Sequence, residues 1–123
     1  MATVVLDRFR IVSGREGRAR EWMRLLNERI EECRATLDHE QIYFEAIFSE
    51  ERDGRLHLYW VELKDPGGRD VRESRDEIDQ VHLAFWDECV EPGSRTVMAT
   101  ELVLIPQFLR EAIGEQRGSG AND

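Results

Sequence analysis

A chain of 123 residues has the size of one compact domain, and its 41% hydrophobic and 35% charged residues are the balance of a globular protein, not of a disordered chain. The formal net charge of -9 argues against binding to nucleic acid, where affinity comes mainly from clustered cations. The apolar stretches are far shorter than the ~20 residues that span a bilayer, and the N-terminus lacks a basic segment followed by an apolar one, so we expect a soluble cytoplasmic protein that does not bind membranes.

The first predicted elements are a strand and a long helix. Residues 3–12 are rich in β-branched and apolar residues, which favours a strand. Ser13 and Glu16 have the spacing of a capping box, in which the two side chains accept hydrogen bonds from unpaired backbone N–H groups at a helix start. Apolar residues then recur every three or four positions from Ala19, which predicts one amphipathic helix that ends near Leu37.

A β-hairpin follows this helix. Residues 42–48 alternate between two sets of side chains, as a strand does, and residues 56–64 form a second strand-like run. Asp53 and Gly54 lie between the two runs and suit a turn with positive φ. Pro66 and the two glycines after it end the second strand.

The last third of the chain predicts a helix, a strand and a tail. A second capping box at Ser74 and Glu77 precedes an apolar stripe that runs from Ile78 to Cys89. Residues 96–105 are expected to form the last strand, and residues 107–113 a short helix. We therefore expect one domain over residues 1–113 and a mobile tail over residues 114–123. We interpret Cys33 and Cys89 as small buried hydrophobes in a reducing compartment, with a disulfide left open.

These elements have the chain order βαββαβ, which is that of an α+β ferredoxin-like fold with a four-stranded antiparallel sheet. In that fold the helices cover one face of the sheet. The first and last strands carry apolar residues on both sides, as in Val5 and Leu6 or Leu102 and Val103. An uncovered apolar face is best explained by a partner, so we expect a symmetric homodimer in which two sheets face each other.

The sequence resembles the dimeric α/β-barrel superfamily, which includes antibiotic-biosynthesis-type monooxygenases and stress-responsive barrel proteins, and is most similar to an uncharacterised bacterial and archaeal family within it. The residues that carry this resemblance are residues 10–16, Trp22, Leu26, Asn27, residues 43–48, Asp76, Ile78, Asp79, His82, Glu88 and Cys89. The resemblance implies that two sheets form a barrel. It also implies that ligands bind inside that barrel or in a cleft between sheet and helices.

Asp79 and His82 are the first candidate site. They are three residues apart on the predicted second helix and therefore share a face, and Trp86 lies one turn further on. A carboxylate beside an imidazole fixes its tautomer and raises its basicity, as a general base requires. The alternative is structural, with Asp79 pairing locally and His82 hydrogen-bonded at the edge of the core.

Charged residues inside the predicted strands are a second candidate. Glu45, Glu62 and Glu101 interrupt apolar runs on three strands, and Arg8 and Arg10 are expected to face them. Buried carboxylates paired with arginine could bind a polar substrate group or act as an acid or base. They could equally be ion pairs that fix the register of a dimer.

Four large aromatic side chains are candidates for a pocket that binds a flat organic ligand, with plain core packing as the alternative: Tyr43, Tyr59, Trp60 and Trp86. His57 and His82 lack the spacing of a metal site, so we expect no metal. No motif for a cofactor, for a phosphate-binding loop or for nucleophilic catalysis is visible in the sequence.

The leading hypothesis for function is therefore a small homodimeric barrel that binds a small organic molecule near His82, Trp86 and the sheet. An enzyme is the first alternative: a cofactor-independent oxygenase, isomerase or cyclase with Asp79 and His82 as the base and Glu62 or Tyr59 orienting the substrate.

The second alternative is a structural or regulatory dimer. It predicts that no pocket lies beside the second helix. It also predicts an apolar outer face on that helix, formed by Leu83, Trp86 and Val90.

Overall fold

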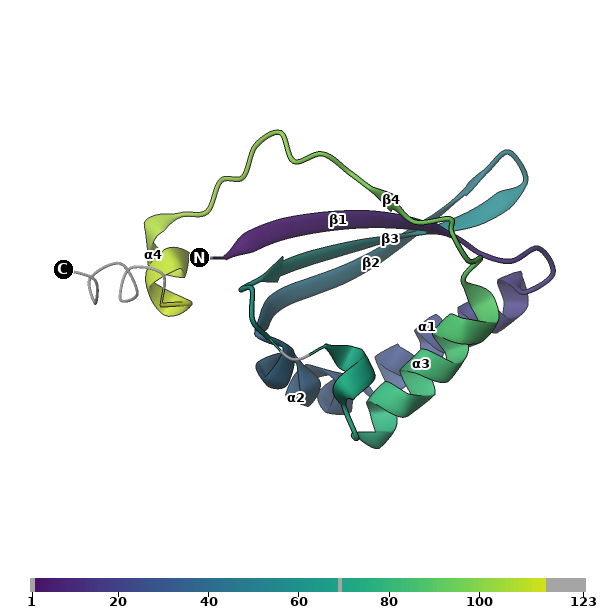
Figure 1. The fold of residues 1–123 in the computed structure, drawn as a ribbon, viewed down its shortest axis with the longest axis horizontal. Helices are drawn as coiled ribbons and strands as arrows, with labels where there is room; N and C mark the ends of the chain where they lie inside the picture. The colour runs from purple at the N-terminus through teal and green to yellow at the C-terminus, as the bar shows by residue number, and fades with distance from the viewer. Residues whose placement is uncertain (1, 69, 115–123) are drawn as a thin grey trace.

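The computed structural model describes residues 2–68 and 70–114. Its elements, in chain order, are β1 (Thr3–Arg10), α1 (Glu16–Glu28), α2 (Ile30–Glu40), β2 (Ile42–Arg52), β3 (Arg55–Lys64), the short 3-10 helix η1 (Val71–Glu73), α3 (Glu77–Cys89), β4 (Thr96–Val97) and α4 (Gln107–Ala112). The strands form one antiparallel sheet in the order β2-β3-β1-β4. Helices α1, α2 and α3 lie on the same side of it (Figure 1). The predicted ferredoxin-like α+β fold is confirmed.

The predicted first helix is two helices, because the chain leaves the helical conformation at Arg29 (φ -110°, ψ 38°). The backbone N–H of Arg29 still donates to the Leu25 carbonyl of α1. Its side chain pairs with Glu32 of α2 and Glu77 of α3, so Arg29 stabilises the bend by joining all three helices. After the bend, α2 packs against β2 and α3. A periodic apolar pattern continues through such a bend, which is why the pattern predicted one helix.

Neither predicted capping box forms. Gly14 adopts a positive φ of 93°, and the resulting turn places Arg15, not Ser13, before α1. The Glu16 carboxylate instead accepts from the Gly14 N–H at 2.9 Å. At the start of α3, the Ser74 hydroxyl accepts from the N–H of Asp76, two residues on. This shorter serine turn competes with the box.

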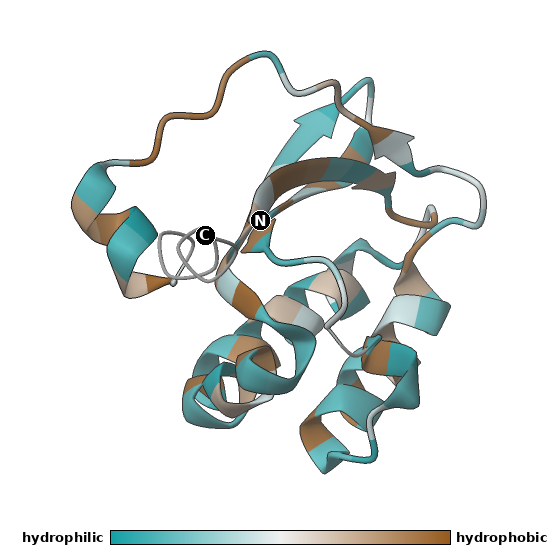
Figure 2. Cartoon of the chain, turned by 60° about the vertical axis from the view of Figure 1, so that its left-hand side comes forward, coloured by the Kyte–Doolittle hydropathy of each residue, from teal (hydrophilic) through white to brown (hydrophobic). Residues whose placement is uncertain are grey.

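The predicted last strand is much shorter than expected. Only Thr96–Val97 pairs with β1, and one more backbone bond joins the Met98 N–H to the Leu6 carbonyl. The following residues, 99–106, leave the sheet as an extended arm that leads to α4 (Figures 1 and 2). Leu102 and Leu104 on this arm are 73% and 81% exposed. The edge of β1 continues past Leu6, and the Thr100 hydroxyl donates to the Val4 carbonyl at 3.4 Å, but among the described residues no backbone pairing between the arm and β1 extends beyond Met98.

Each strand divides its side chains between two faces of the sheet. The inner face, which the helices cover, carries Asp7, Phe9, Glu45, Ile47, Leu58, Trp60 and Glu62. The outer face carries three cross-strand rows, which are Val4, Leu63 and Phe44, then Leu6, Val61 and Ala46, then Arg8, Tyr59 and Phe48. Phe44 and Phe48 are 53% and 61% exposed, so large aromatic surface lies on the side that has no helix.

The core lies between the inner face and the helices. Its most deeply buried side chains are Ile11, Trp22, Leu58 and Cys89. Both Cys33 and Cys89 are free thiols. No helix among the described residues combines the length and the apolar character needed to cross a membrane. Apart from Gly114, the predicted tail lies outside the described residues.

Candidate functional site

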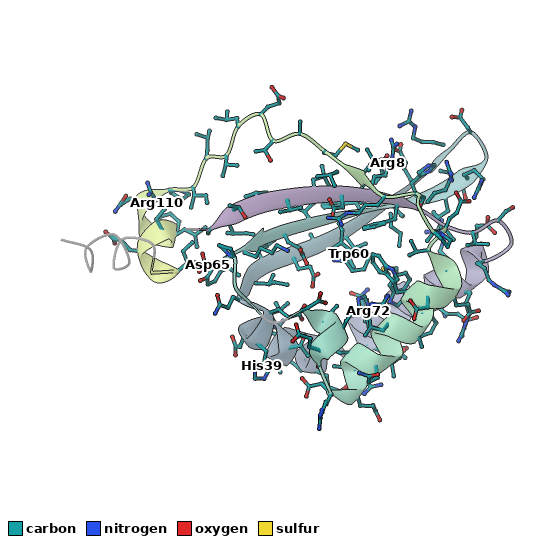
Figure 3. All side chains as sticks on the ribbon, viewed as in Figure 1. Arg8, His39, Trp60, Asp65, Arg72 and Arg110 are labelled. Carbon is teal, nitrogen blue, oxygen red and sulfur yellow. The ribbon has the colours of Figure 1, made fainter. Side chains whose placement is uncertain are left out.

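A pocket of about 420 Å³ opens between the inner face of the sheet and helices α2, η1 and α3. The strands contribute Phe9, Trp60 and several carboxylates, and α3 contributes Ile78, Asp79, His82, Leu83 and Trp86. Trp60 points from β3 toward the helices (Figure 3). Ligand pockets for small molecules fall in this range of volume and combine apolar walls with a few polar groups.

All three tryptophans of the chain surround His82. The ring centroids of Trp22, Trp60 and Trp86 lie 5.4, 5.6 and 6.2 Å from that of the imidazole. Trp60 and Trp86 meet edge to face at 5.3 Å, and Phe9 packs on Trp86 at 4.6 Å. Aromatic pairs at these separations stabilise one another, so this wall of the pocket is fixed in place.

His82 is held as a neutral hydrogen-bond donor. The indole N–H of Trp22 donates to its Nδ1 at 3.1 Å, so the ring proton is assigned to Nε2. Burial, together with the charge of Arg72, lowers the pKa of His82 to about 4. The sequence predicted that Asp79 would set the tautomer and raise the basicity. In the structure Trp22 sets the tautomer, the pKa shifts downward, and no hydrogen bond joins Asp79 to His82.

Glu45 and Glu62 lie directly opposite each other on β2 and β3. The indole N–H of Trp60 donates to Glu45 Oε2 at 2.6 Å, and Lys64 lies 3.4 Å from Glu62. Burial and the Glu62 carboxylate raise the pKa of Glu45 to about 8, against the opposing effect of the Trp60 bond. Glu45 as a whole is exposed because β2 is an edge strand, while its carboxyl group accepts from Trp60, lies opposite Glu62 and lines the pocket, so the direction of the shift is firmer than its size.

Glu40, the last residue of α2, adds another carboxyl group at the same end of the pocket. Burial, then the charges of Asp79 and Glu62, raise its pKa to about 7. Gly68 packs against the Glu40 backbone carbonyl so closely that a Cβ at this position would collide with it. The loop after β3 therefore approaches the end of α2 this closely only because residue 68 is glycine.

Asp79 and Asp7 are the least compensated acids of the site. Asp79 is only 6% exposed, and neither of its carboxylate oxygens has a hydrogen-bond or ion-pair partner among the described residues. Asp7 pairs with Arg95 through Oδ2 at 2.9 Å, while its Oδ1 is buried without a hydrogen-bond partner in the described part of the chain. Such groups normally find partners in a folded protein, so these two carboxylates need an explanation.

The pocket has an excess of acidic groups over basic ones. Six acidic side chains line it, namely Asp7, Glu40, Glu45, Glu62, Asp70 and Asp79, against the two arginines Arg72 and Arg95. Both arginines are already engaged, Arg72 with Asp87 at 2.9 Å and Arg95 with Asp7. Among residues 2–68 and 70–114, no group of three or more His, Cys, Asp or Glu side chains is arranged to hold a metal ion.

Six of the predicted site residues converge on this pocket: Glu45, Trp60, Glu62, Asp79, His82 and Trp86. Two do not. The hydroxyl of Tyr43 donates to Asp65, and that of Tyr59 donates to Glu50 from the outer face of the sheet. The predicted exposed face formed by Leu83, Trp86 and Val90 is absent as well, because Leu83 and Trp86 line the pocket and Val90 is 8% exposed.

The arginines of β1 do not face the pocket carboxylates. Arg8 lies on the outer face and donates to Thr96 at 3.4 Å, and Arg10 pairs with Glu91. Glu101 is exposed on the arm after β4. The expectation that Arg8 and Arg10 neutralise these acids was therefore wrong, since strand alternation places them on the opposite face from Glu45 and Glu62.

Sequence analysis missed Trp22, Glu40 and Asp7 as site residues. Trp22 belongs to an apolar helical stripe, and periodicity alone cannot tell a core tryptophan from one that orients a histidine. Asp7 did carry a signal, because a single acid within an apolar strand must either reach the surface or meet a partner. Its cross-strand neighbour on the inner face is Trp60.

The fold and the site together define a ferredoxin-like α+β protein with a ligand-sized pocket between its sheet and its helices. The chain belongs to a family of unknown function (DUF6176), whose model matches residues 2–111. Its structure is similar to the crystal structure of an L-rhamnose mutarotase from Formosa agariphila, with 16% sequence identity, a TM-score of 0.47, and coverage of 85% of this chain and 99% of that one. Comparison with curated proteins gives no match.

Proposed function

We propose that this protein binds a small organic molecule in the pocket beside His82. The observation that supports the proposal is the pocket itself, because a purely structural role for His82 and Trp86 predicts that the space beside them is filled by side chains. About 420 Å³ remains there instead. It is bordered by polar atoms with free hydrogen-bonding capacity, which would be costly to keep in a core without a ligand or water.

The pocket walls indicate how a ligand is held. Trp60 and Trp86 offer flat apolar surfaces for the body of the molecule. The Nε2–H of His82 is available as a donor because Nδ1 is occupied by Trp22. The carboxyl groups of Glu45, Glu62 and Asp79 act as acceptors. A flat or compact molecule that carries hydroxyl or amine donors satisfies these groups together.

A thermal-shift screen with aromatic and polyketide-like compounds tests the proposal. Compounds that bind should raise the melting temperature of the wild type and of His39→Gln, a matched substitution at an exposed histidine on α2. They should raise it less for His82→Gln and for Trp86→Phe, which keep similar shapes. Equal shifts in all four proteins, or no shift with any compound, would contradict binding at this site.

We also propose that the outer face is covered by a second copy of the chain. Phe44 and Phe48 form rows with Leu63 and Tyr59 on the side of the sheet without helices, and the extended arm exposes Leu102 beyond β4. Exposed aromatic and leucine side chains gathered on one side of a sheet suit an interface, and twofold symmetric pairing is the commonest way to bury them.

Acid–base catalysis is a second candidate function, and the Glu45–Glu62 pair is the observation that favours it. With its raised pKa, Glu45 holds a proton near neutral pH while Glu62 faces it across the strands. A carboxyl group that keeps its proton can donate it to a substrate, and a second carboxyl group that faces it could accept a proton from the same substrate, as an isomerase or cyclase needs. Asp79 and His82 would then position the substrate.

Hydrogen exchange tests this second candidate. A carbonyl compound identified in the screen is incubated with the protein in D2O, and loss of its α-proton signal is followed by NMR. Catalysed exchange that is lost in Glu45→Gln but kept in Glu51→Gln, an exposed glutamate of the same strand, is the expected result. Absence of exchange with every bound carbonyl compound would leave simple binding as the function.

A further inference from the structure

The charge of the pocket restricts what can bind there. Its six acidic side chains outnumber its two arginines, and both arginines have acidic partners. An anionic ligand would find no uncommitted cation among the described lining residues. Phosphates, sulfates and carboxylates are therefore disfavoured, because their sites usually supply a free arginine or lysine, and the first turn of α3 at the pocket already carries the acids Glu77 and Asp79.

Asp79 shows that the excess negative charge is aimed into the pocket. The residue is 94% buried on the first turn of α3, lines the pocket, and has no hydrogen bond or ion pair among residues 2–68 and 70–114. Asp7 Oδ1, on the opposite wall, is buried and also lacks a hydrogen bond within the described chain. An enclosed carboxylate is stable only when an opposite charge or donors compensate its lost hydration.

Two tryptophans beside Asp79 supply aromatic surface, which attracts cations in addition to a carboxylate. Trp60 and Trp86 meet edge to face at 5.3 Å and both line the same pocket as Asp79. Tryptophan is the best of the aromatic side chains at attracting a cation held within about 6 Å of its ring. The Trp60 N–H fixes the Glu45 carboxyl group at 2.6 Å, so ring and acid are oriented as a unit.

From this arrangement we infer that the pocket takes an organic cation, a protonated amine or a guanidinium carried on an aromatic or aliphatic body, with Asp79 as its counter-ion and Trp60 and Trp86 against its apolar part. The inference rests on the proposed ligand-binding function and specifies the class of ligand. It requires no covalent step.

Proton linkage supports the same conclusion. The pKa of Glu40 is raised to about 7 and that of Glu45 to about 8, by burial first and then by neighbouring acids. A bound cation favours the ionised form of both carboxyl groups and so lowers both pKa values. Binding should therefore release protons, and the affinity for a cation should rise as the pH increases from 6 to 8.

Tyramine and 4-propylphenol provide a matched pair of probes, because they share a phenol and differ in an ammonium group against a methyl group. Agmatine serves as a guanidinium probe. Binding is followed by the fluorescence of the three tryptophans, all of which surround His82. We expect tyramine to bind at least about tenfold more tightly than 4-propylphenol, the difference that one desolvated cation–π contact or ion pair can supply.

Substitutions locate the effect. Asp79→Asn keeps the shape of the side chain and should weaken tyramine binding about tenfold or more, while Asp38→Asn, at an exposed position of α2, should leave it unchanged. Glu45→Gln should reduce the rise in tyramine affinity between pH 6 and pH 8, and it gives a second test if Asp79→Asn does not fold. Circular dichroism of each variant verifies its fold.

Equal or tighter binding of 4-propylphenol would overturn the inference while leaving the proposed pocket intact, because a neutral ligand would then be preferred. Failure of both tyramine and agmatine to bind at millimolar concentration would overturn it as well. If uncharged compounds from the screen bind in that case, the ligand-binding function stands and only the charge class is wrong. If nothing binds, both proposals fail.

Discussion

The two faces of the same sheet differ in a way that reverses the usual pattern of burial. On the covered inner face, the side chains of Asp7 and Glu62 are only 14% and 20% exposed, whereas Phe44 on the open outer face is 53% exposed. Single folded chains normally place acids outside and aromatic side chains inside. The proposed ligand would compensate the acids of the inner face, and the proposed second copy would cover the aromatic side chains of the outer face.

The outer face gives the largest expected effect. If a second copy covers it, wild-type protein should have twice the chain mass of 14.4 kDa by light scattering, and the double variant Phe44→Glu, Phe48→Glu should have the single-chain mass. In the dimer, the two introduced carboxylates would be buried opposite those of the other copy, and the free energy needed to bury them would exceed the free energy of association.

Ser49→Glu is the control for this experiment, because it adds a charge to the same strand on the opposite face. It should leave the dimer intact. A wild-type protein that is monomeric at micromolar concentration would contradict the proposal that a second copy covers the outer face of the sheet.

The inner face gives the next largest effect, through His82. Its folded pKa of about 4 lies below the ordinary 6.5, so the unfolded chain binds more protons between these values and stability falls as the pH is lowered through this window. The full loss is about 3 kcal/mol. Urea denaturation at neutral and at acidic pH should show it in wild type and in His39→Gln. In His82→Gln this part of the pH dependence should disappear, and a slope unchanged from wild type would be evidence against a buried neutral imidazole.

Glu45 should act in the opposite direction, and more weakly than its pKa shift alone would indicate, because the residue is exposed at the sheet edge and water screens its charge. Its pKa of about 8 exceeds the ordinary 4.5, so the folded state retains a proton that the unfolded state releases, and this contribution to stability is lost as the pH rises toward 8. Glu45→Gln should therefore melt higher than wild type above pH 8 and close to wild type at pH 5. Glu51→Gln, on the same strand but exposed, should show no such crossover in melting curves.

The smallest effect is expected for charges that lie away from the pocket and the outer face. Glu31 and Arg34 form an ion pair on the exposed side of α2. Water screens such pairs, so Arg34→Gln should leave the melting temperature essentially unchanged at neutral pH. A large drop in the melting temperature of Arg34→Gln would show that exposed charges affect stability as strongly as the carboxyl groups of the pocket.

The sequence was sufficient for the fold because the fold depends on local periodicity. Alternation in β2 and β3 and the turn at Asp53 and Gly54 predicted the hairpin, and the hairpin brings Glu45 opposite Glu62. The arm after Val97 was predicted as strand because its pattern is strand-like. Whether it pairs depends on whether the arm stays alongside the edge of β1, and the alternation of its side chains does not determine that path.

The site was predictable only in part for a related reason. His82, Asp79 and Trp86 share one helix, so their proximity follows from spacing. The Trp22–His82 hydrogen bond joins residues 60 positions apart on two helices, and which two stripe residues meet depends on how those helices pack. That contact changes the expected role of His82 from a base to a neutral donor.

The most direct test of the pocket is an NMR measurement of the two ring nitrogens of His82 by long-range proton–nitrogen correlation across a pH series. His39 and His57 appear in the same spectrum, and the His82→Gln variant identifies the His82 signals. We predict a neutral ring protonated on Nε2 that persists to about pH 5, as a pKa near 4 and the indole bond from Trp22 require. A ring that gains its second proton near the ordinary value of about 6.5, with its two tautomers mixed, would contradict the geometry on which the pocket is built.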